Sequence, residues 1–533
     1  MICNKKIVYW GGGLICKTCL EYYPETRPDF IIDSNPKCKI NDLQVCSPDE
    51  ISNWKDLFIV ITTVYGSEIE KKLEQFGLKR GEDFLFYKNF FNINTDIISS
   101  LNAISKYVRE SLGCKKCVLL YIPCFTFRQK ESMTNFFKQY VVWHNDINFV
   151  VISVLEVVPE EVASEKIGAK VFNLPDIVRW DGSERKYELC YDKIGNKDSL
   201  LTEEVKKIEE RKISFNYEKS LSITTNLYLY LKSLFEILHP GKLIIWGEWS
   251  RTSYIFAELA KKNNIPYGFM EWGWIPGTLQ FDPVGIAGQS EYAVNPAIVN
   301  NNKNKFTNID LVEKIKRYVL NNQLDTGIFK IIPEDEKQLS KLDSTKKTVF
   351  LVGMGDIEMG MNSDCDYWKE YVSDIVSSTK DSYNLIREIC KSNNLNFIYK
   401  PHPHSRTKVE DDMYRSDLDT IYITDMSIDK LIDMSDVVVS IASAVDYKAL
   451  MYNKALVSLG KTGFNGKNCV YEVHSRKEVE SKLLLAIEKG ISAEQISNYN
   501  RFLQFLLENY LWDDLSHPDF QYGLSLNKDF FDK

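Results

Sequence analysis

The stretch "SDVVVSIASAVDYKAL", residues 435–450, joins an apolar, β-branched run to small residues and then to a helix-forming segment. The valine run is typical of a buried strand, and the segment after it predicts a helix. Ser440, Ser443 and Ala444 therefore lie where the strand ends and the helix begins. Backbone N–H and hydroxyl groups at such a place can bind an anion. Simple N-capping by serine would explain the same residues equally well.

The same alternation of strands and helices extends along the whole chain in three segments. They cover residues 1–92, 113–335 and 345–533, and the charged stretch 334–346 is the best candidate for a linker. Alternating strands and helices predict parallel sheets. We expect an α/β protein, in which a small Rossmann-like module precedes two doubly wound domains. Ligands bind at the carboxyl ends of such strands, so a cleft between the two domains is the expected active site.

Composition narrows the class of protein further. The chain has 533 residues and a net charge of −8, which does not favour nucleic acid as a partner. No apolar run reaches about 18 residues, so we expect no transmembrane helix. The first residues lead directly into a predicted strand rather than forming a signal peptide. The 12 cysteines are scattered, which suits a reducing cytoplasm.

Histidines gather after one predicted strand of the third segment. "YKPHPHS", residues 399–405, ends a strand at Lys400 and then holds His402 and His404 between prolines, with Arg406 just beyond. Prolines fix φ and lower the entropic cost of placing the imidazoles. Histidine can donate to a phosphate and arginine binds phosphate well, so we expect a phosphate site here. A rigid turn with a capping histidine is the alternative.

An acid among aromatic residues marks the middle segment. In "FMEWGWIPGTLQFD", residues 269–282, Glu271 ends a predicted strand and is followed by Trp272 and Trp274. A carboxyl group in apolar surroundings can have a raised pKa and act as a base, and tryptophans are good surfaces for stacking sugars. Glu248 ends the preceding strand and would share this site. The alternative is a buried turn with an exposed acid.

The first segment carries a glycine cluster, "YWGGGLICKTCL" at residues 9–20. Gly11 and Gly13 fit the first two glycines of a dinucleotide-binding turn, and Asp33 ends the next strand where a ribose-binding acid would lie. Cys16 stands where the third glycine would be. We therefore expect a strand–turn–helix unit here, and ligand binding only as its less favoured interpretation.

Two patterns raise the question of a metal, and we expect none. Cys16 and Cys19 lie on a predicted helix, and Cys114 and Cys117 precede a strand, so both pairs favour buried thiols over a zinc site. "DCD", residues 364–366, resembles a metal-binding Asp-x-Asp. Its place just before a helix favours capping.

Taken together, these motifs resemble the GT-B glycosyltransferases of bacterial capsule and surface polysaccharide synthesis, above all the family that includes Kdo transferases. Polysialyltransferases and teichoic-acid glycerophosphotransferases are more distantly similar. The shared pattern is an acid-x-Gly at 271–273, a Lys-Pro-His-Pro at 400–403 and a Ser-x-x-Ser at 440–443. "FLVGMGDIEMG" resembles a loop of that family, with Asp356 at its acid. The likeness covers about residues 240–465.

The resemblance implies roles for single residues. Glu271 would deprotonate the acceptor hydroxyl, His402 would contact the donor phosphate, and Ser440 and Ser443 would bind phosphate oxygens of the leaving nucleotide. Such enzymes need neither a metal nor another cofactor. Sialyl-type relatives carry two adjacent acids before the glycine, whereas Trp272 stands at the second of these positions here.

We therefore expect a cytoplasmic GT-B glycosyltransferase that moves a sugar from a nucleotide-activated donor, CMP-linked sugars included, to a surface glycan or glycolipid. The third segment would hold the donor and the middle segment the acceptor, with a final helix that crosses back. Peripheral association with the inner face of the membrane or with assembly proteins stays open. The alternatives are a teichoic-acid-type phosphotransferase, a non-catalytic nucleotide-sugar-binding protein and, from the first segment, a nicotinamide enzyme.

Overall fold

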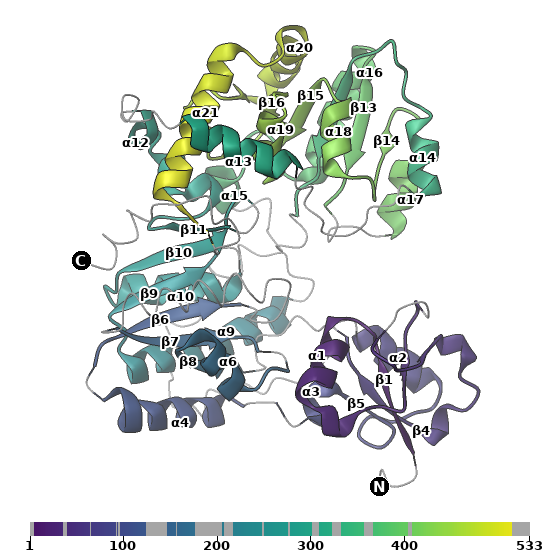
Figure 1. Ribbon diagram of the computed structural model, residues 1–533, viewed down its shortest axis with the longest axis vertical. Coiled ribbons are helices and arrows are strands. Elements are labelled where there is room, and N and C mark those ends of the chain that lie inside the picture. Colours follow the sequence, from purple (N-terminus) through teal and green to yellow (C-terminus); the bar gives the residue numbers. More distant parts are fainter. Residues whose placement is uncertain are drawn as a thin grey trace. The chain divides into compact units, whose positions relative to one another are not determined.

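The structure is a computed structural model that holds three sheets flanked by helices (Figure 1). It describes residues 5–35, 40–63, 66–91, 93, 96–113, 115–123, 147–155, 157–175, 205–206, 217–247, 250–275, 278–300, 309–321, 332–355, 366–402 and 408–513. Within these ranges no helix is long and apolar enough to cross a membrane. The α/β class predicted from the alternation of strands and helices is confirmed.

Two compact units make up the chain. The first comprises Met1–Val205, Glu218–Trp246 and Ile255–Pro266, and the second comprises Lys206–Tyr217, Gly247–Tyr254 and Tyr267–Lys533. All contacts described below for the candidate site lie within the second unit.

The first sheet is parallel throughout, as predicted, and its strand order is β3-β2-β1-β4-β5. Alternating strands and helices are typical of parallel pairing, because the connection between two parallel strands must cross over the sheet and usually does so as a helix. The strands are β1 (Lys6–Trp10), β2 (Phe30–Ile32), β3 (Val45–Cys46), β4 (Leu57–Ile61) and β5 (Phe84–Phe86). The helices are α1 (Leu14–Tyr22), α2 (Gly66–Gln75) and α3 (Tyr87–Phe90).

The second sheet has the strand order β18-β11-β10-β9-β6-β7-β8. Strands β6 to β9 pair in parallel, whereas β10 pairs with β11, and β11 with β18, in antiparallel fashion. The strands are β6 (Cys117–Ile122), β7 (Asn148–Ser153), β8 (Lys170–Asn173), β9 (Lys242–Trp246), β10 (Tyr267–Trp272), β11 (Thr278–Asp282) and β18 (Leu511–Asp513). The helices around these strands in the sequence are α4 (Ile97–Tyr107), α6 (Glu160–Ile167), α9 (Tyr217–Leu238), α10 (Arg251–Lys262), α11 (Glu291–Val294), α12 (Ala297–Asn300) and α13 (Ile309–Asn321).

The antiparallel edge differs from the expected doubly wound sheet. Strands β10 and β11 are joined by only residues 273–277, and so short a connection can link only antiparallel neighbours. The predicted final helix ends at Asn509, and the chain then adds β18 to the free side of β11. A strand after that helix thus makes the return to the middle segment.

The third sheet is parallel throughout, with the strand order β14-β13-β12-β15-β16-β17. Its strands are β12 (Thr348–Val352), β13 (Asn396–Lys400), β14 (Ile421–Tyr422), β15 (Val437–Ser440), β16 (Ala455–Ser458) and β17 (Tyr471–Glu472). The helices are α14 (Pro333–Leu339), α15 (Asp366–Tyr371), α16 (Thr379–Ser392), α17 (Lys408–Ser416), α18 (Ile428–Met434), α19 (Val445–Met451), α20 (Val479–Lys489) and α21 (Ala493–Asn509).

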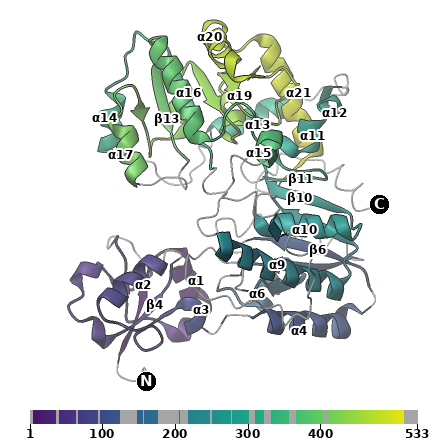
Figure 2. The ribbon, with the colours of Figure 1, turned by 180° about the vertical axis from the view of Figure 1, so that it is seen from behind.

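Both faces of the third sheet are buried, so its strands are apolar without alternation. Phe350 and Val352 of β12 pack with residues of α13, α18, α19 and α21, whereas Val349 and Leu351 pack with residues of α16 and α20. Figures 1 and 2 show these two layers of helices from opposite sides. The doubly wound arrangement predicted for this segment is present.

One sequence expectation in this region needs correction. The charged stretch 334–346 is not a free linker, because it contains most of α14, whose Asp335 is fully buried. The segment before β13 forms two helices, α15 and α16. The side chain of Ser378 accepts a hydrogen bond from the backbone N–H of Asp381, and this N-cap starts α16.

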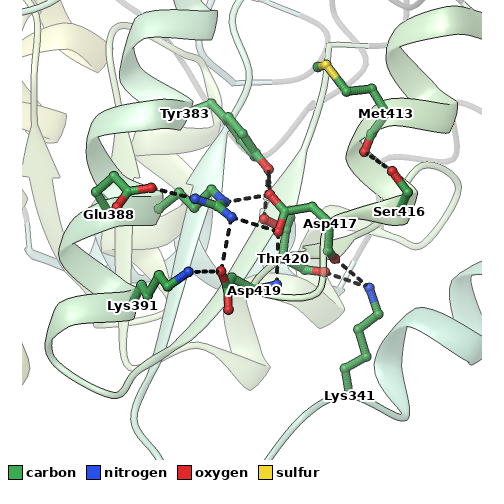
Figure 3. Close-up of polar contacts among 10 residues, drawn as sticks. Lys341, Tyr383, Glu388, Lys391, Met413, Ser416, Asp417, Asp419 and Thr420 are labelled. Carbon is green, nitrogen blue, oxygen red and sulfur yellow. Dashed lines mark hydrogen bonds and ion pairs between the residues drawn. The ribbon is translucent and has the colours of Figure 1, made fainter.

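A charged network fixes the loop between α17 and β14 (Figure 3). The guanidinium of Arg387 on α16 pairs with both carboxylate oxygens of Asp417 and, at 3.0 Å, with Asp419. The hydroxyl of Tyr383 donates to Asp417 at 2.8 Å, and Lys391 pairs with Asp419 at 2.8 Å. The burial of Asp417 opposes its ionisation, yet its pKa lies below the usual value because Arg387, a backbone N–H and Tyr383 hydrogen-bond to the carboxylate.

We predict that Arg387→Ala destabilises the chain by about 1–3 kcal/mol, because the largely buried Asp417 loses its cation. Urea unfolding of the full chain measures this change. Lys489→Ala is the control, since Lys489 pairs with Glu488 on the exposed surface and its loss should leave stability unchanged. Equal stability of Arg387→Ala and wild type would contradict the role given to this network.

Candidate functional site

The carboxyl ends of four neighbouring strands in the third sheet lie level with one another. In the strand register, Val352 lies beside Lys400, Leu351 beside Val439, and Ser440 beside Ser458. The loop that follows Lys400 and the loop that follows Ser440 therefore share one edge of the sheet, with β12 between them.

The Lys400 loop is held closely against the end of β12. The backbone N–H of Gly353 donates to the Lys400 carbonyl at 2.8 Å. A Cβ atom on Gly353 would lie 2.8 Å from the Cα of Pro401 and 2.9 Å from the nitrogen of His402. Only glycine fits here, because real Cβ contacts are not that short. His402 is half-buried beside this contact.

Lys400 is buried, and its ammonium donates to the carbonyl of Thr424. That carbonyl belongs to a loop fixed by Asp335 of α14. The Asp335 carboxylate accepts the backbone N–H groups of Thr424 at 3.1 Å, Asp425 at 2.8 Å and Met426 at 3.1 Å. Helix α14, which lies in the stretch predicted as a linker, therefore supports this edge of the sheet. The donor-binding role of Lys400 stays a prediction.

The segment after β15 is organised by an acid that the sequence analysis did not single out, Asp446. The hydroxyl of Ser440 donates to one Asp446 oxygen at 2.6 Å, and the backbone N–H of Ser443 donates to the other at 3.2 Å. The hydroxyl of Ser443 accepts from the N–H of Val445 at 3.2 Å. Asp446 is 1% exposed, and Ala444 lies exposed just before α19.

This arrangement bears on the phosphate-binding roles expected for the two serines. A phosphate needs donors, and the one hydroxyl proton of Ser440 goes to Asp446. Ser443 is half-buried and closer to solvent. Both roles stay predictions, with Ser440 also supporting Asp446. The sequence signal for Asp446 was an acid in the first helical turn, which usually indicates only a favourable charge at a helix N-terminus.

Glu271 lies near the end of β10, opposite Gln280 of β11. Burial raises the pKa of its carboxyl group to about 7, against an opposing hydrogen bond from the N–H of Trp272 at 3.3 Å. Burial also raises the pKa of Asp446 and Asp282 to about 7. Asp282 accepts three backbone N–H groups and Asp446 accepts two hydrogen bonds.

Among the described residues, the Glu271 carboxylate thus accepts fewer hydrogen bonds than the carboxylates of these two acids. One long hydrogen bond leaves most of its lone pairs available, and its side chain is partly exposed. A carboxyl group with a pKa near 7 and free lone pairs suits proton abstraction at neutral pH. The role of Glu271 as the base stays a prediction.

The glycine of the Glu-Trp-Gly motif is required by close packing. The N–H of Gly273 donates to the carbonyl of Thr278 at 2.8 Å, which closes the turn between β10 and β11. A Cβ atom on Gly273 would lie 2.0 Å from Oγ1 of Thr278 and 3.0 Å from a methyl group of Leu511. Any side chain here would push the two strands apart.

The two tryptophans of the motif differ in their surroundings. Trp272 is half-buried, and its carbonyl accepts the side-chain amide of Gln280 at 3.0 Å. Trp274 stacks on the ring of Tyr447, with ring centroids 4.8 Å apart, and its Nε1 donates to the hydroxyl of Tyr292 at 3.1 Å. One face of the Trp274 indole is therefore already covered, and the acceptor-binding role of both tryptophans stays a prediction.

Several predicted site residues lie outside the described residues, namely Glu248, Asp356, His404 and Arg406. The same holds for Asp364 and Cys365 of the Asp-x-Asp, whereas Asp366 begins α15. Across the described part of the chain, no group of three or more His, Cys, Asp and Glu side chains could hold a metal ion.

The glycine turn of the first segment closes on its own acid. Gly11 has φ 111°, and the Asp33 carboxylate accepts the N–H of Gly12 at 2.6 Å. A Cβ atom on Gly13 would meet nothing within 4 Å. Ligand binding by Gly11, Gly13 and Asp33 stays a prediction.

The described cysteines of the two Cys-x-x-Cys pairs are buried. Cys16 and Cys19 lie in the apolar core of the first segment, and Cys117 lies at the start of β6. Cys114 lies outside the described residues. The buried thiols agree with the interpretation of these cysteines as small apolar residues.

A comparison with protein-family models matches part of the third segment. The family model described as "Capsule polysaccharide biosynthesis protein" matches residues 366–483, which include the loops after Lys400 and Ser440. No curated protein matches the chain.

Among solved structures, the chain matches Thermosulfurimonas dismutans KpsC, a beta Kdo 2,7 transferase. It is 17% identical, the match covers 57% of this chain and 87% of that one, and the TM-score is 0.33. A putative UDP-N-acetylglucosamine 2-epimerase from Listeria monocytogenes is 11% identical over 73% and 91% of the two chains, with a TM-score of 0.31. A trehalose-6-phosphate protein from E. coli, bound with UDP-2-fluoro glucose, is 10% identical over 73% and 95%, with a TM-score of 0.37.

We predict that Gly273→Ala destabilises the chain by about 1–3 kcal/mol, because the new methyl group overlaps Thr278. Thermal unfolding measures the change. Gly13→Ala is the matched control, since its methyl group enters open space at φ −73°, and it should lower the unfolding temperature less, by the effect of a weaker N-cap on α1 alone. Equal unfolding temperatures of the two variants would contradict the close packing assigned to Gly273.

Proposed function

We propose that the chain is a glycosyltransferase of capsule or surface polysaccharide synthesis, because residues 366–483 match the family model described as "Capsule polysaccharide biosynthesis protein". It transfers a sugar from a nucleotide-activated donor to a growing glycan or glycolipid. The family match carries this proposal, and it coincides with the sheet edge that holds Lys400, His402 and Ser443. Carboxyl ends of parallel strands are where nucleotides bind in open α/β sheets.

In the proposed reaction, Glu271 is the general base. Its carboxylate takes the proton of the acceptor hydroxyl while the hydroxyl oxygen bonds to the anomeric carbon of the donor sugar. The bond between that carbon and the phosphate oxygen breaks, and the nucleotide leaves with the negative charge. The raised pKa and single hydrogen bond of Glu271 support this role.

The donor phosphates would meet His402 and the Ser443 loop, where the Ser443 hydroxyl and the His402 imidazole can stabilise the leaving nucleotide. We propose that these groups suffice without a metal ion. Adding a chelator to the transfer assay tests this point, and loss of transfer with chelator would contradict it.

The direct experiment incubates the full chain with an acceptor glycan and CMP-, UDP- or GDP-linked sugars, followed by mass spectrometry of both products. We expect one nucleotide to be released and the acceptor to gain the mass of one sugar. A product that gains phosphate together with an alcohol would instead identify a phosphotransferase. Nucleotide binding without turnover would favour a non-catalytic component.

We predict that Glu271→Gln lowers kcat by about 100-fold or more, since general bases contribute at least that factor. Nucleotide binding, measured by calorimetry, should not change, because Glu271 is assigned to the acceptor. Glu291→Gln is the control: this acid also belongs to the second unit, where it accepts the Tyr510 hydroxyl at 3.3 Å, and its loss should leave kcat within about threefold. A Glu271→Gln enzyme with wild-type kcat would rule out this base.

A further inference from the structure

The indole of Trp274 joins two parts of the chain that are far apart in the sequence. It lies just beyond β10, and it stacks on Tyr447 of α19 at an interplanar angle of 12°. Tyr447 is buried, and a Cβ atom on Gly463 would lie 2.9 Å from its hydroxyl oxygen, so the ring has little space to move.

A continuous series of contacts leads from Glu271 to this stack. Gln280, which pairs with Glu271 across the strands, donates to the Trp272 carbonyl at 3.0 Å. The Tyr292 hydroxyl donates to the side-chain carbonyl of Gln280 at 3.5 Å and accepts from Nε1 of Trp274 at 3.1 Å. The position of Glu271 is thus tied to that of the indole.

A second series leads from the stack to the serine loop. Tyr447 directly follows Asp446, whose carboxylate holds Ser440 and Ser443. The carbonyl of Tyr447 accepts the hydroxyl of Tyr499 at 2.9 Å, which fixes α19 to α21. A displacement of the Tyr447 ring would therefore move the loop proposed to bind the donor.

We propose that Trp274 is a positioning residue of the transfer reaction, whose stacked indole holds the strand end bearing Glu271 in register with the helix bearing the serine loop. This inference rests on the proposed function. It assigns Trp274 a different role from stacking on the acceptor sugar. Catalysis is sensitive to such register, since a misplacement of about 1 Å can cost about 100-fold in rate.

Steady-state kinetics of Trp274→Ala separate the two roles. A positioning residue affects kcat, so we expect kcat to fall at least about tenfold while the acceptor KM stays within about threefold. Trp274→Phe keeps a ring on Tyr447 and should restore kcat to within about threefold of wild type. A raised acceptor KM with unchanged kcat would instead assign Trp274 to acceptor binding and overturn the inference.

Trp54→Ala is the matched control, because Trp54 stacks in a similar way on Trp10 of β1, with ring centroids 5.1 Å apart. It should leave kcat and KM unchanged. A fall in kcat as large as that of Trp274→Ala would show that losing any stacked indole has this effect. A Trp274→Phe enzyme as slow as Trp274→Ala would also contradict the inference.

A measurement without substrate separates failure of this inference from failure of the proposed function. The Glu271 carboxyl carbon, labelled with carbon-13 and assigned with Glu271→Gln, can be titrated by NMR. We expect its midpoint in Trp274→Ala to fall from the wild-type value toward that of an ordinary glutamate, and to be kept in Trp274→Phe. An unchanged midpoint in Trp274→Ala overturns the positioning role. Absence of transfer from every donor overturns the proposed function alone.

Discussion

Gly273 lets β10 and β11 approach more closely than any residue with a side chain would permit, because a Cβ atom there would lie 2.0 Å from Oγ1 of Thr278. The tight turn keeps Glu271 opposite Gln280 and directs Trp274 onto Tyr447. The acid of the Glu-Trp-Gly motif and the serine loop of the third sheet are then parts of one packed unit. A single glycine thus sets the geometry on which the proposed chemistry depends.

Three acids of the second unit differ in how many hydrogen bonds their carboxylates accept. Among the described residues, Asp335 and Asp446 are enclosed by donors and hold loops in place, whereas Glu271 accepts one long hydrogen bond. A carboxylate that is largely removed from water and has few hydrogen-bond partners costs folding free energy, and such groups tend to be kept where chemistry needs them. The contrast among these acids supports assigning the base to Glu271 and structural roles to the other two.

Much of the fold could be predicted from local pattern. The valine run before Ser440 and the apolar run before Lys400 each form a strand of a parallel sheet, since both faces of that sheet are covered. The site was predictable to the extent that its residues follow strand ends. Glu271, Lys400 and Ser440 all lie there, and the register places the last two on one edge.

What local pattern could not predict depends on contacts between distant residues. The charged segment around Asp335 resembles a linker because only its contact with Thr424–Met426, about ninety residues away, makes it part of the sheet edge. Trp274 resembles a sugar-binding surface until Tyr447 is seen to cover one face. Asp446 resembles an ordinary helix-start acid until Ser440 is seen to donate to it.

The pH dependence of kcat, measured with the donor that supports transfer, tests most directly whether Glu271 is the base. Glu271 must be ionised to act as the base, and burial raises its pKa to about 7. We therefore expect kcat to rise with pH through a midpoint near 7 and then level off, and the residual activity of Glu271→Gln to lack this rise. A rise that persists unchanged in Glu271→Gln would show that another group is the base.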